Sequence, residues 1–456
     1  MIRKLLRRVF RRTASTTVPE PALVPVAQHG ITRERISPAA NKVCTTLQDA
    51  GFKAYVVGGA VRDLIAGIVP KDYDVATDAT PEEVRGLFRR SRIIGRRFKI
   101  VHVMSGPETI EVSTFRARQD ADSHETDEHG RILRDNVFGS QEEDAGRRDF
   151  TVNALYYDPV SETVLDYHHG VADLQQKTLR MIGDPRVRYR EDPVRMLRAV
   201  RLGAKLGLSI DPAARHPIRE MASLLENVPP ARLFDEMLKL LLSGHAVNCL
   251  KQLREEGLHH GLLPLLDVIL EQPLGERFVW LALENTDHRV RQGKPVSPGF
   301  LFATLLWHEV LANWAARRAE GEHAHPALFA AMDEVLGSQA EKLAITRRIA
   351  GDIKEIWSLQ PRFERRVGKA PFRLLEQPRF RAAWDFLLLR AQSGEVGLDL
   401  PAWWDRFAHG GHDERENLLK EDAGGGSAST PRRRRRRRKS GSREENGREV
   451  ETAPAE

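Results

Sequence analysis

The sequence contains very little cysteine. Only Cys44 and Cys249 occur among its 456 residues. This excludes a framework of structural disulfides and a cysteine-rich zinc site, and it is typical of a protein kept in a reducing compartment. Long apolar runs are also missing, because the best, residues 300–307, is well under half of the roughly twenty residues that a membrane-spanning helix needs. The chain is long enough for about two to four domains.

The charge is distributed unevenly along the chain. It carries 71 basic and 64 acidic residues, a net charge of +7. Residues 1–12 hold six basic residues and no acid, and residues 431–439 hold eight basic residues, so the remainder of the chain has a net charge of −7. Both ends can bind polyanions without sequence preference, whereas the middle needs local arginine-rich faces to do so.

The stretch AYVVGGAVRDLIAGIVPKDYDVAT, residues 54–77, has a strand–helix–strand pattern. The pattern predicts a strand that ends at Gly58 and Gly59, a helix after these glycines, and a second strand over residues 72–75. Glycines let the backbone approach a ligand closely, and free N–H groups at the start of a helix attract phosphate. The first half of this stretch therefore predicts a phosphate site.

Asp72 and Asp74 lie two residues apart in the second predicted strand. Their carboxylates should share one face, with Cα atoms about 6.5 Å apart. Two such carboxylates raise each other's pKa, and a divalent cation removes the conflict. Mg²⁺ is usually held by one or two carboxylates together with substrate phosphates. A lone pair with this spacing is more often a solvated turn, but next to the glycine turn it predicts a site for a metal and a nucleoside triphosphate.

The motif G-G-x-V-R-D followed by K-D-x-D resembles the catalytic head of the nucleotidyltransferases that include tRNA CCA-adding enzymes and bacterial poly(A) polymerases. A second segment, RRDFTVNAL over residues 147–155, resembles the family motif in which an arginine–aspartate unit and an asparagine contact the nucleotide. We expect Asp149 and Asn153, four residues apart on a helix, to share a face. The alternative, a surface helix with salt bridges, would require this long match to be chance.

A third segment, YREDPVRMLRAVR over residues 189–201, predicts a helix that Asp192 caps and that has Pro193 at its first position. Apolar residues recur on one face of this helix, and basic residues occupy another arc. The basic residues are Arg195, Arg198, Arg201 and Lys205.

The family resemblance assigns roles to this third segment. It implies that Glu191, Asp192 and Arg195 recognise the base of the incoming nucleotide and that Arg198 steadies the triphosphate. The alternative is a solvated charged face, which is the stronger interpretation for the last two basic residues of the helix.

The resemblance implies three further site residues. Arg62 would hold the phosphates together with the two glycines. Glu111, within a predicted strand over residues 109–115, would be a third acidic group at the metal site, although it could also be a sheet-face residue paired with an arginine. Arg116, at the end of that strand, would contact a phosphate or the base.

The mechanism implied by the resemblance is phosphoryl transfer with two Mg²⁺ ions, one of them held by Asp72 and Asp74, with ATP as the substrate. Several segments and the basic C-terminus are most similar to poly(A) polymerases. We therefore expect template-independent addition of AMP to RNA 3′-hydroxyl ends, with release of pyrophosphate, in RNA processing and decay. Two alternatives stay open: a tRNA CCA-adding enzyme, and a catalytically inactive RNA-binding protein on the same fold.

We expect an α+β fold, with a small mixed-sheet nucleotidyltransferase head followed by an all-helical neck and body. The expected parts are a basic amphipathic extension and linker (1–35), the catalytic head (36–170), a neck that recognises the base and binds RNA (171–242), an RNA-binding helical body (243–421) and a disordered arginine-rich tail (422–456).

Residues 1–12 place apolar residues on one face of a predicted helix and six basic residues on the other. This pattern favours contact with an anionic membrane or with RNA, and a frayed terminus is the alternative. The expected partners are RNA 3′ ends and RNA-decay proteins, in the cytoplasm or at the inner face of the membrane. Basic and aromatic residues also alternate over residues 363–384, which indicates either RNA contact or the exposed faces of a helical bundle.

Overall fold

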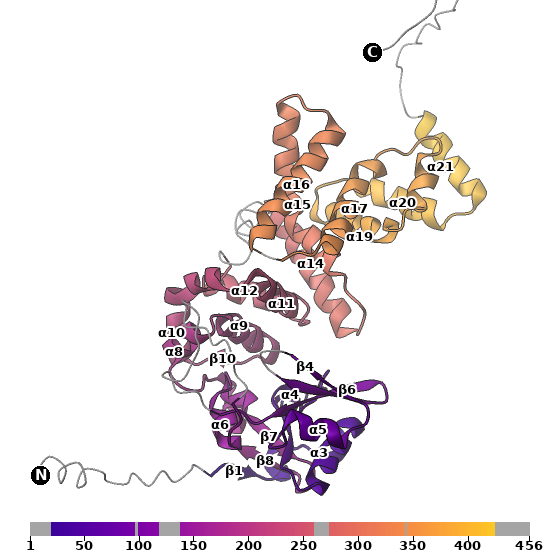
Figure 1. Cartoon of the computed structure of the whole chain (residues 1–456). Coiled ribbons are helices and arrows are strands. Elements are labelled where there is room, and N and C mark those ends of the chain that lie inside the picture. The colour runs from indigo at the N-terminus through magenta and orange to yellow at the C-terminus, as the bar shows by residue number, and fades with distance from the viewer. Residues whose placement is uncertain (1–19, 96–98, 118–136, 260–272, 343, 425–456) are drawn as a thin grey trace, which may run out of the picture.

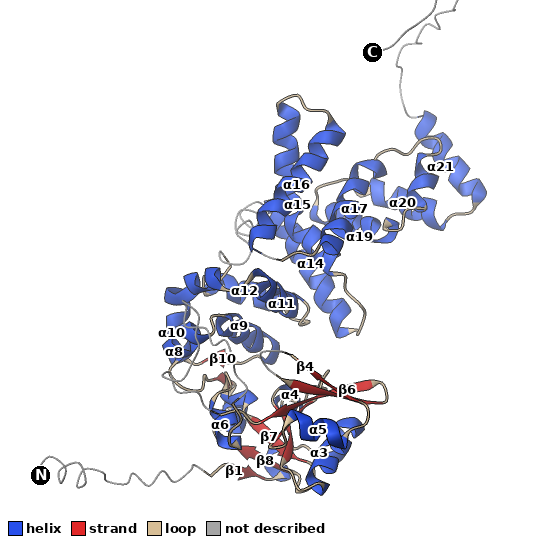
Figure 2. Ribbon diagram, viewed as in Figure 1, coloured by secondary structure: helices blue, strands red, loops and turns tan. Residues whose placement is uncertain are grey.

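The computed structural model describes residues 20–95, 99–117, 137–259, 273–342 and 344–424. One sheet with its covering helices forms the head, and helices form the neck and the body that follow it (Figure 1). Strands are confined to the head and the beginning of the neck in the described part of the chain (Figure 2). The expected α+β architecture is therefore confirmed.

The head is built on a mixed sheet in which β3 and β6 run parallel and all other neighbours run antiparallel. The alternation of apolar residues in the sequence accounts for these strands. In spatial order the described strands are β1 (Ala22–Val24), β8 (Thr163–Asp166), β7 (Leu155–Asp158), β2 (Ala54–Val57), β3 (Asp74–Thr77), β6 (Glu108–Thr114), β5 (Ile100–Ser105) and β4 (Ser91–Ile94).

Three helices pack beside the apolar face of this sheet: α3 (Pro38–Asp49), α4 (Gly59–Ile65) and α5 (Pro81–Leu87). Their apolar side chains meet strand residues such as Val75 and Val112, both at most 1% exposed. Strand residues alternate between the two faces. Asp74 and Glu111, each adjacent in sequence to one of these valines, therefore lie on the opposite face.

The second strand of the central stretch begins at Asp74, not at residue 72 as predicted. Val57 pairs with Asp74 and ends β2, because Gly58 turns the chain with φ +68°. No residue of β2 is therefore left to pair with Asp72, which lies in the connection before β3. Part of the extension and linker expected over residues 1–35 belongs to the head sheet, because Ala22–Val24 pair with β8 as β1.

The neck contains α7 (Gly170–Gln175), α8 (Pro185–Glu191), α9 (Val194–Leu206), α10 (Pro212–Met221), α11 (Pro230–Leu241) and α12 (Ala246–Glu255). The amphipathic pattern of α9 is confirmed, because Met196, Leu197 and Val200 are at most 2% exposed. Asp192 is not the cap residue of α9 as predicted. Pro193 takes that position with helical backbone angles, and an Asp192 oxygen accepts from Val194 N–H at 3.3 Å.

The body comprises α14 (Pro273–Arg291), α15 (Pro298–Ala319), α16 (Ala324–Lys342), α17 (Arg347–Phe363), α18 (Ala370–Leu375), α19 (Phe380–Ser393), α20 (Asp399–His409) and α21 (His412–Gly424). One hydrophobic core runs from α8 and α9 through α12 into α14, α15 and α17. The neck and the body are therefore joined by continuous apolar packing.

Two of the predicted segments fall outside the described residues. These are the basic helix over residues 1–12 and nearly all of the arginine-rich tail, of which residues 422–424 belong to α21. Within the described ranges, none of the helices has the length and apolar character needed to cross a membrane.

The first residue of α7, Gly170, allows a test of the contact between the start of the neck and the head. A Cβ atom at Gly170 would lie 2.2 Å from the backbone oxygen of Thr151, in the 3₁₀ turn η3 (Thr151–Asn153). We expect Gly170→Ala to lower the free energy of unfolding by about 1–3 kcal/mol, because backbone atoms must move to relieve the overlap. Thermal and urea unfolding followed by circular dichroism measure the effect.

Gly146 provides the matched control for this prediction. It ends α6 (Gln141–Gly146), and a Cβ atom there would meet nothing within 4 Å. Gly146→Ala should therefore leave the stability unchanged or slightly higher. Equal stabilities of the two variants would contradict the close contact between α7 and η3.

Candidate active site

A polar cavity of about 410 Å³ lies where the head meets the neck. Nine of the residues singled out in the sequence line it, together with two arginines, Arg148 and Arg201. The nine are Gly58, Gly59, Arg62, Asp74, Asp149, Asn153, Asp192, Arg195 and Arg198. Segments that are far apart in the chain thus converge on one pocket, as the sequence motifs predict.

The acidic side of the pocket is organised by strand pairing. Asp74 on β3 lies directly opposite Glu111 on β6, and Glu111 lies opposite His102 on β5. Directly paired residues point to the same face of a sheet. The Glu111 Oε1 atom is 3.2 Å from His102 Nε2. Glu111 thus lies beside Asp74 on the sheet, and its role as a third acidic group at a metal site stays a prediction.

The Asp74 carboxyl group is electrostatically strained. Asp74 is exposed at the surface of the pocket, yet its pKa is raised to about 6, first because the surrounding protein restricts the water around it, and then because the neighbouring Glu111 repels its charge. Arg148 partly opposes this shift, and Asp72 adds to it. The effect of Asp72 on Asp74 agrees with the expectation that the two carboxylates lie near each other, although Asp72 does not line the cavity.

In the described part of the chain, no three carboxylate, histidine or cysteine side chains already converge to hold a metal ion. The oxygen atoms of Asp72 and Asp74, with Glu111 adjacent, are nevertheless the donors that Mg²⁺ prefers, and Mg²⁺ commonly completes its shell with water and substrate phosphates. The donor chemistry thus fits a divalent cation that binds together with a nucleotide.

The glycine turn is required by the backbone and by a close neighbour. Gly58 has φ +68°, a conformation that residues with a Cβ rarely adopt. A Cβ atom there would also lie 3.1 Å from Arg148 Nη1. Arg148 is held by Asp144 at 3.1 Å and by the Tyr156 hydroxyl at 3.1 Å. The glycine therefore lets a fixed arginine reach the floor of the pocket.

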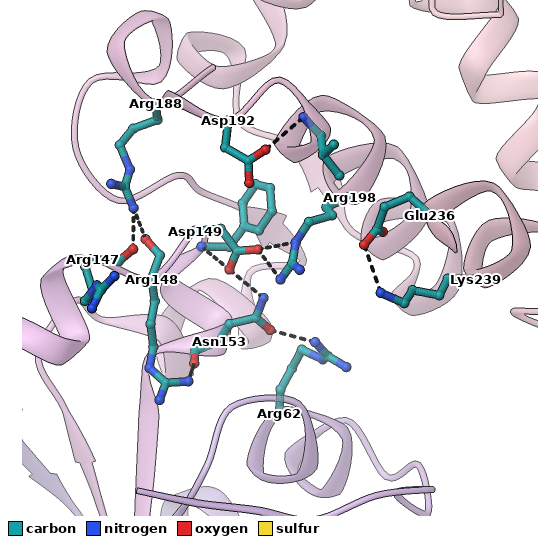
Figure 3. Close-up of polar contacts among 12 residues, drawn as sticks. Arg62, Arg147, Arg148, Asp149, Asn153, Arg188, Asp192, Arg198, Glu236 and Lys239 are labelled. Atoms are coloured by element: carbon teal, nitrogen blue, oxygen red, sulfur yellow. Dashed lines mark hydrogen bonds and ion pairs between the residues drawn. The ribbon is translucent and has the colours of Figure 1, made fainter. Parts of the chain in front are cut away.

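A chain of hydrogen bonds crosses the pocket from the head to the neck (Figure 3). Arg62 Nη1 donates to Asn153 Oδ1 at 2.6 Å, and Asn153 Nδ2 donates to Asp149 Oδ1 at 2.9 Å. Arg198 Nε, from α9, then donates to Asp149 Oδ2 at 2.7 Å. Burial alone would raise the pKa of the Asp149 carboxyl, but Arg198, Asn153 and the Phe150 amide hold it down at about 2.

Asp149 and Asn153 meet, but not on an α-helix as predicted. The helix before them, α6, ends at Gly146, Phe150 is extended and pairs with Met181, and Thr151–Asn153 form η3. The turn brings Asn153 back to Asp149 and buries the intervening Phe150 and Val152. Sequence spacing gave the correct contact through the wrong local structure, because a helix and this turn both place residues i and i+4 close together.

Of the three residues expected to recognise the base, two line the pocket and the third holds one of them in place. Asp192 and Arg195 line the pocket, whereas Glu191 does not. Glu191 Oε2 instead accepts from Arg195 Nη1 at 2.9 Å and from Arg188 Nη1 at 2.8 Å. In the structure Glu191 therefore orients Arg195.

Asp192 and Arg116 are anchored to other elements. Asp192 accepts from Arg232 of α11 at 2.6 Å. Arg116 lies just after β6, pairs with Phe138 and donates its backbone N–H to Asp144 at 3.3 Å. Arg116 is not among the residues that line the cavity, so its contact with a nucleotide stays a prediction.

Three residues of the site were missed or undervalued from the sequence. Arg148 is an arginine of the second motif, and it lines the pocket although it was not singled out as a site residue. Arg201, which could have been a solvated residue, lines the pocket three residues after Arg198. Glu236 of α11 is 6% exposed and acts electrostatically on Arg198 and Arg201. A lone acid on the apolar face of a predicted helix was the signal for Glu236.

The comparisons with known proteins first support the fold. The crystal structure of the Bacillus stearothermophilus CCA-adding enzyme in complex with CTP superposes with a TM-score of 0.55 at 25% identity, and the match covers 85% of this chain and 83% of that one. This fold, together with the carboxylate pair and the arginine-lined pocket, defines a nucleotidyltransferase.

The relatives in sequence are more specific. Poly(A) polymerase I of Salmonella typhi is 46% identical over 414 residues, which are 88% of this chain and 89% of the relative. The enzyme of the same name from Haemophilus influenzae is 43% identical over 422 residues, which are 90% and 93% of the two chains. The CCA-adding enzyme of Lactobacillus helveticus is 37% identical, but over only 45% of this chain and 50% of the relative.

Three segments also match families described as "Poly A polymerase head domain" (54–180), "Probable RNA and SrmB- binding site of polymerase A" (207–270) and "Polymerase A arginine-rich C-terminus" (320–440). The chain belongs to the poly(A) polymerase I family.

The raised pKa of Asp74 predicts an effect of pH on stability. A carboxyl group whose folded-state pKa is raised destabilises the fold when it is ionised, and the penalty is complete above about pH 6 and absent below the unfolded-state pKa of 3.8. We expect Asp74→Asn to raise Tm at pH 8 in metal-free buffer, and to raise it about half as much at pH 5. Thermal unfolding at both pH values measures the difference.

Magnesium provides the control for this experiment. At pH 8, added Mg²⁺ should raise Tm of the natural protein and have less effect on Asp74→Asn, because a ligand that binds only the folded state stabilises it. A variant that is less stable than the natural protein at pH 8 would contradict the strained carboxylate.

Proposed function

We propose that this protein adds AMP from ATP to the 3′-hydroxyl ends of RNA without a template and releases pyrophosphate. The observation that carries the proposal is the pocket in which Asp74 faces five arginines from the head and the neck. Extensive identity to poly(A) polymerase I enzymes over nearly 90% of the chain supports adenylation rather than CCA addition.

Different residues of the pocket would bind the phosphates, the ribose and the base of the nucleotide. Arg62, Arg148, Arg198 and Arg201 converge where a triphosphate would place its negative charge, and such charge neutralisation is most of what phosphoryl transfer requires. Asn153 and Asp149 are fixed beside them by hydrogen bonds and would contact the ribose. Arg195, oriented by Glu191, and Asp192, oriented by Arg232, would present a donor and an acceptor to the base.

Asp72 and Asp74, with Glu111 beside them, would hold magnesium. When bound, two Mg²⁺ ions supply activation of the RNA 3′-hydroxyl and neutralisation of the triphosphate. The pairing of β3 with β6 supports this proposal, because Asp74 and Glu111 are direct neighbours across the two strands.

The first test is incorporation of single nucleotides. The purified full chain is incubated with Mg²⁺, an RNA that carries a 3′-hydroxyl, and each nucleoside triphosphate separately, beside a tRNA that lacks its CCA end. Long ladders from ATP alone are expected. A few additions that require CTP and occur only on the tRNA would identify CCA addition. Tight RNA binding without incorporation would show an inactive RNA-binding protein.

The carboxylates provide the second test. Asp72→Ala and Asp74→Ala should each lower AMP incorporation by about 10³-fold or more, because they remove oxygen ligands of the catalytic metal. The far-ultraviolet circular dichroism spectrum should not change, since neither residue lies in the hydrophobic core. Normal turnover in either variant would overturn the assignment of the metal site.

We also propose that the protein acts in the cytoplasm on RNA ends, together with RNA-decay proteins, and that residues 1–12 contact the anionic inner face of the membrane. Six basic residues opposite an apolar face support this proposal. Deletion of residues 1–12 should abolish sedimentation with vesicles that contain anionic lipid and leave AMP incorporation on free RNA unchanged. Equal sedimentation of the full and shortened chains would exclude the membrane contact.

A further inference from the structure

A second cavity lies in the body, outside the pocket described above. It has a volume of about 620 Å³, within the range of about 300–1,000 Å³ that is usual for small-molecule sites. It is formed by the C-terminal end of α14, the segment that leads into α15, and one side of α19. None of the catalytic groups lines it, so the chemistry of the active site does not explain it.

The lining of this cavity, which we call the α14–α19 cavity, is basic. Four cations line it, against the single carboxylate of Asp385; they are Arg289, Lys294, Arg379 and Arg381. Two of them have acidic partners, since Arg379 pairs with Asp352 and Glu355, and Arg381 lies 3.2 Å from Asp385. Arg289 donates to the Pro295 oxygen at 3.0 Å. The excess of positive charge favours a polyanion.

The rest of the lining suits a nucleobase better than a bare anion. Phe300, Leu388 and Leu389 provide apolar surface for the face of a ring. Asn285, Gln292 and Gln392 provide side-chain amides, each of which can both donate and accept a hydrogen bond, as a base edge requires. Proteins that hold single-stranded nucleic acid combine base-stacking surfaces with cations along the backbone. One nucleotide of an RNA strand matches both kinds of lining.

The cavity is connected to the active site by packed elements. Asp287, next to the cavity on α14, accepts from Ala246 N–H at 2.7 Å and so holds the start of α12. Burial lowers the pKa of His245, Asp287 of α14 opposes this shift, and the charges of Arg291 and of Lys205 on α9 add to it. Lys205 in turn donates to Asp63 of α4 at 2.7 Å. The neck thus bridges the cavity and the head.

From these observations we infer that the α14–α19 cavity binds one nucleotide of the single-stranded RNA substrate, upstream of the 3′ end that occupies the active site. The inference rests on the proposed function, because it requires that the protein act on RNA. It adds a specific subsite, lined by both basic and apolar side chains, in a part of the chain to which no catalytic residue is assigned.

The test uses a charge-reversal variant of the full chain, Lys294→Glu with Arg381→Glu, and a control, Lys42→Glu with Lys53→Glu. All four side chains belong to exposed residues, and the control pair lies in the head on and just after α3. Two RNAs are compared by fluorescence anisotropy: an unstructured RNA long enough to reach from the active site to the body, and a primer too short to do so. Incorporation of AMP is measured on both.

We expect the cavity variant to bind the long RNA about tenfold more weakly and to flatten the plot of log Kd against log salt by about 1.4, the loss expected for two phosphate contacts to a single strand. Its initial rate of AMP addition to the short primer should equal that of the natural protein and of the control. A 4-thiouridine at successive upstream positions of the long RNA should crosslink to α14, α15 or α19 at one position.

Two results would overturn the inference. One is that the cavity variant binds the long RNA with the affinity and salt dependence of the natural protein. The cavity would then not bind RNA, and an acidic protein segment would be the better explanation of its basic lining. The other is crosslinks that map only outside these three helices. If the natural protein adds no AMP to either RNA, the proposed function fails instead, so the two failures are distinguishable.

Discussion

The hydrogen-bonded ion pair between Asp149 and Arg198 is the contact on which the rest of the site depends. Asp149 belongs to the head and Arg198 to α9 of the neck, and the carboxylate is 7% exposed. A buried pair of this kind is costly to break, because either partner left alone would be an uncompensated charge. The pair fixes the distance between head and neck, and with it the width of the cavity in which the nucleotide would bind.

A second constraint acts against stability. The sheet brings Asp74 and Glu111 side by side, and no cation of the described chain pairs with Asp74 closely enough to prevent its raised pKa. A protein selected for stability alone would not retain this arrangement. A divalent cation bound at these carboxylates would remove the repulsion, so the same repulsion that weakens the head without a ligand would increase the advantage of binding.

Much of this organisation is readable in the sequence where short-range physics decides it. The strand that ends at the two glycines, the amphipathic α9 and the grouping of the three motifs follow from hydrophobic periodicity, from glycine chemistry and from a resemblance to known enzymes. The sequence could not predict which side chain or strand each of these residues contacts across the fold. The start of β3 at Asp74 depends on where β2 ends, and the roles of Glu191 and Glu236 depend on which arginine they face across the fold.

The second motif also shows why an error in local structure did not spoil the predicted site. Spacing alone brought Asp149 and Asn153 together, and it would have done so on a helix or on a 3₁₀ turn. The direction of Phe150 and Val152 could not be predicted in this way, because it depends on a core that the neck completes.

The alternation within this motif has a mechanical consequence. Phe150 and Val152 are fully buried in the core that continues through the neck into the body, while Asp149 and Asn153 point into the pocket. The two polar residues therefore have little independent freedom, because the buried neighbours of each are held in that core and β7 of the sheet begins at Leu155. Gly58 and Gly59 follow β2, and Asp74 begins β3, so a turn of the second motif against the sheet would move Asp149 and Asn153 together relative to the Asp74 carboxylate.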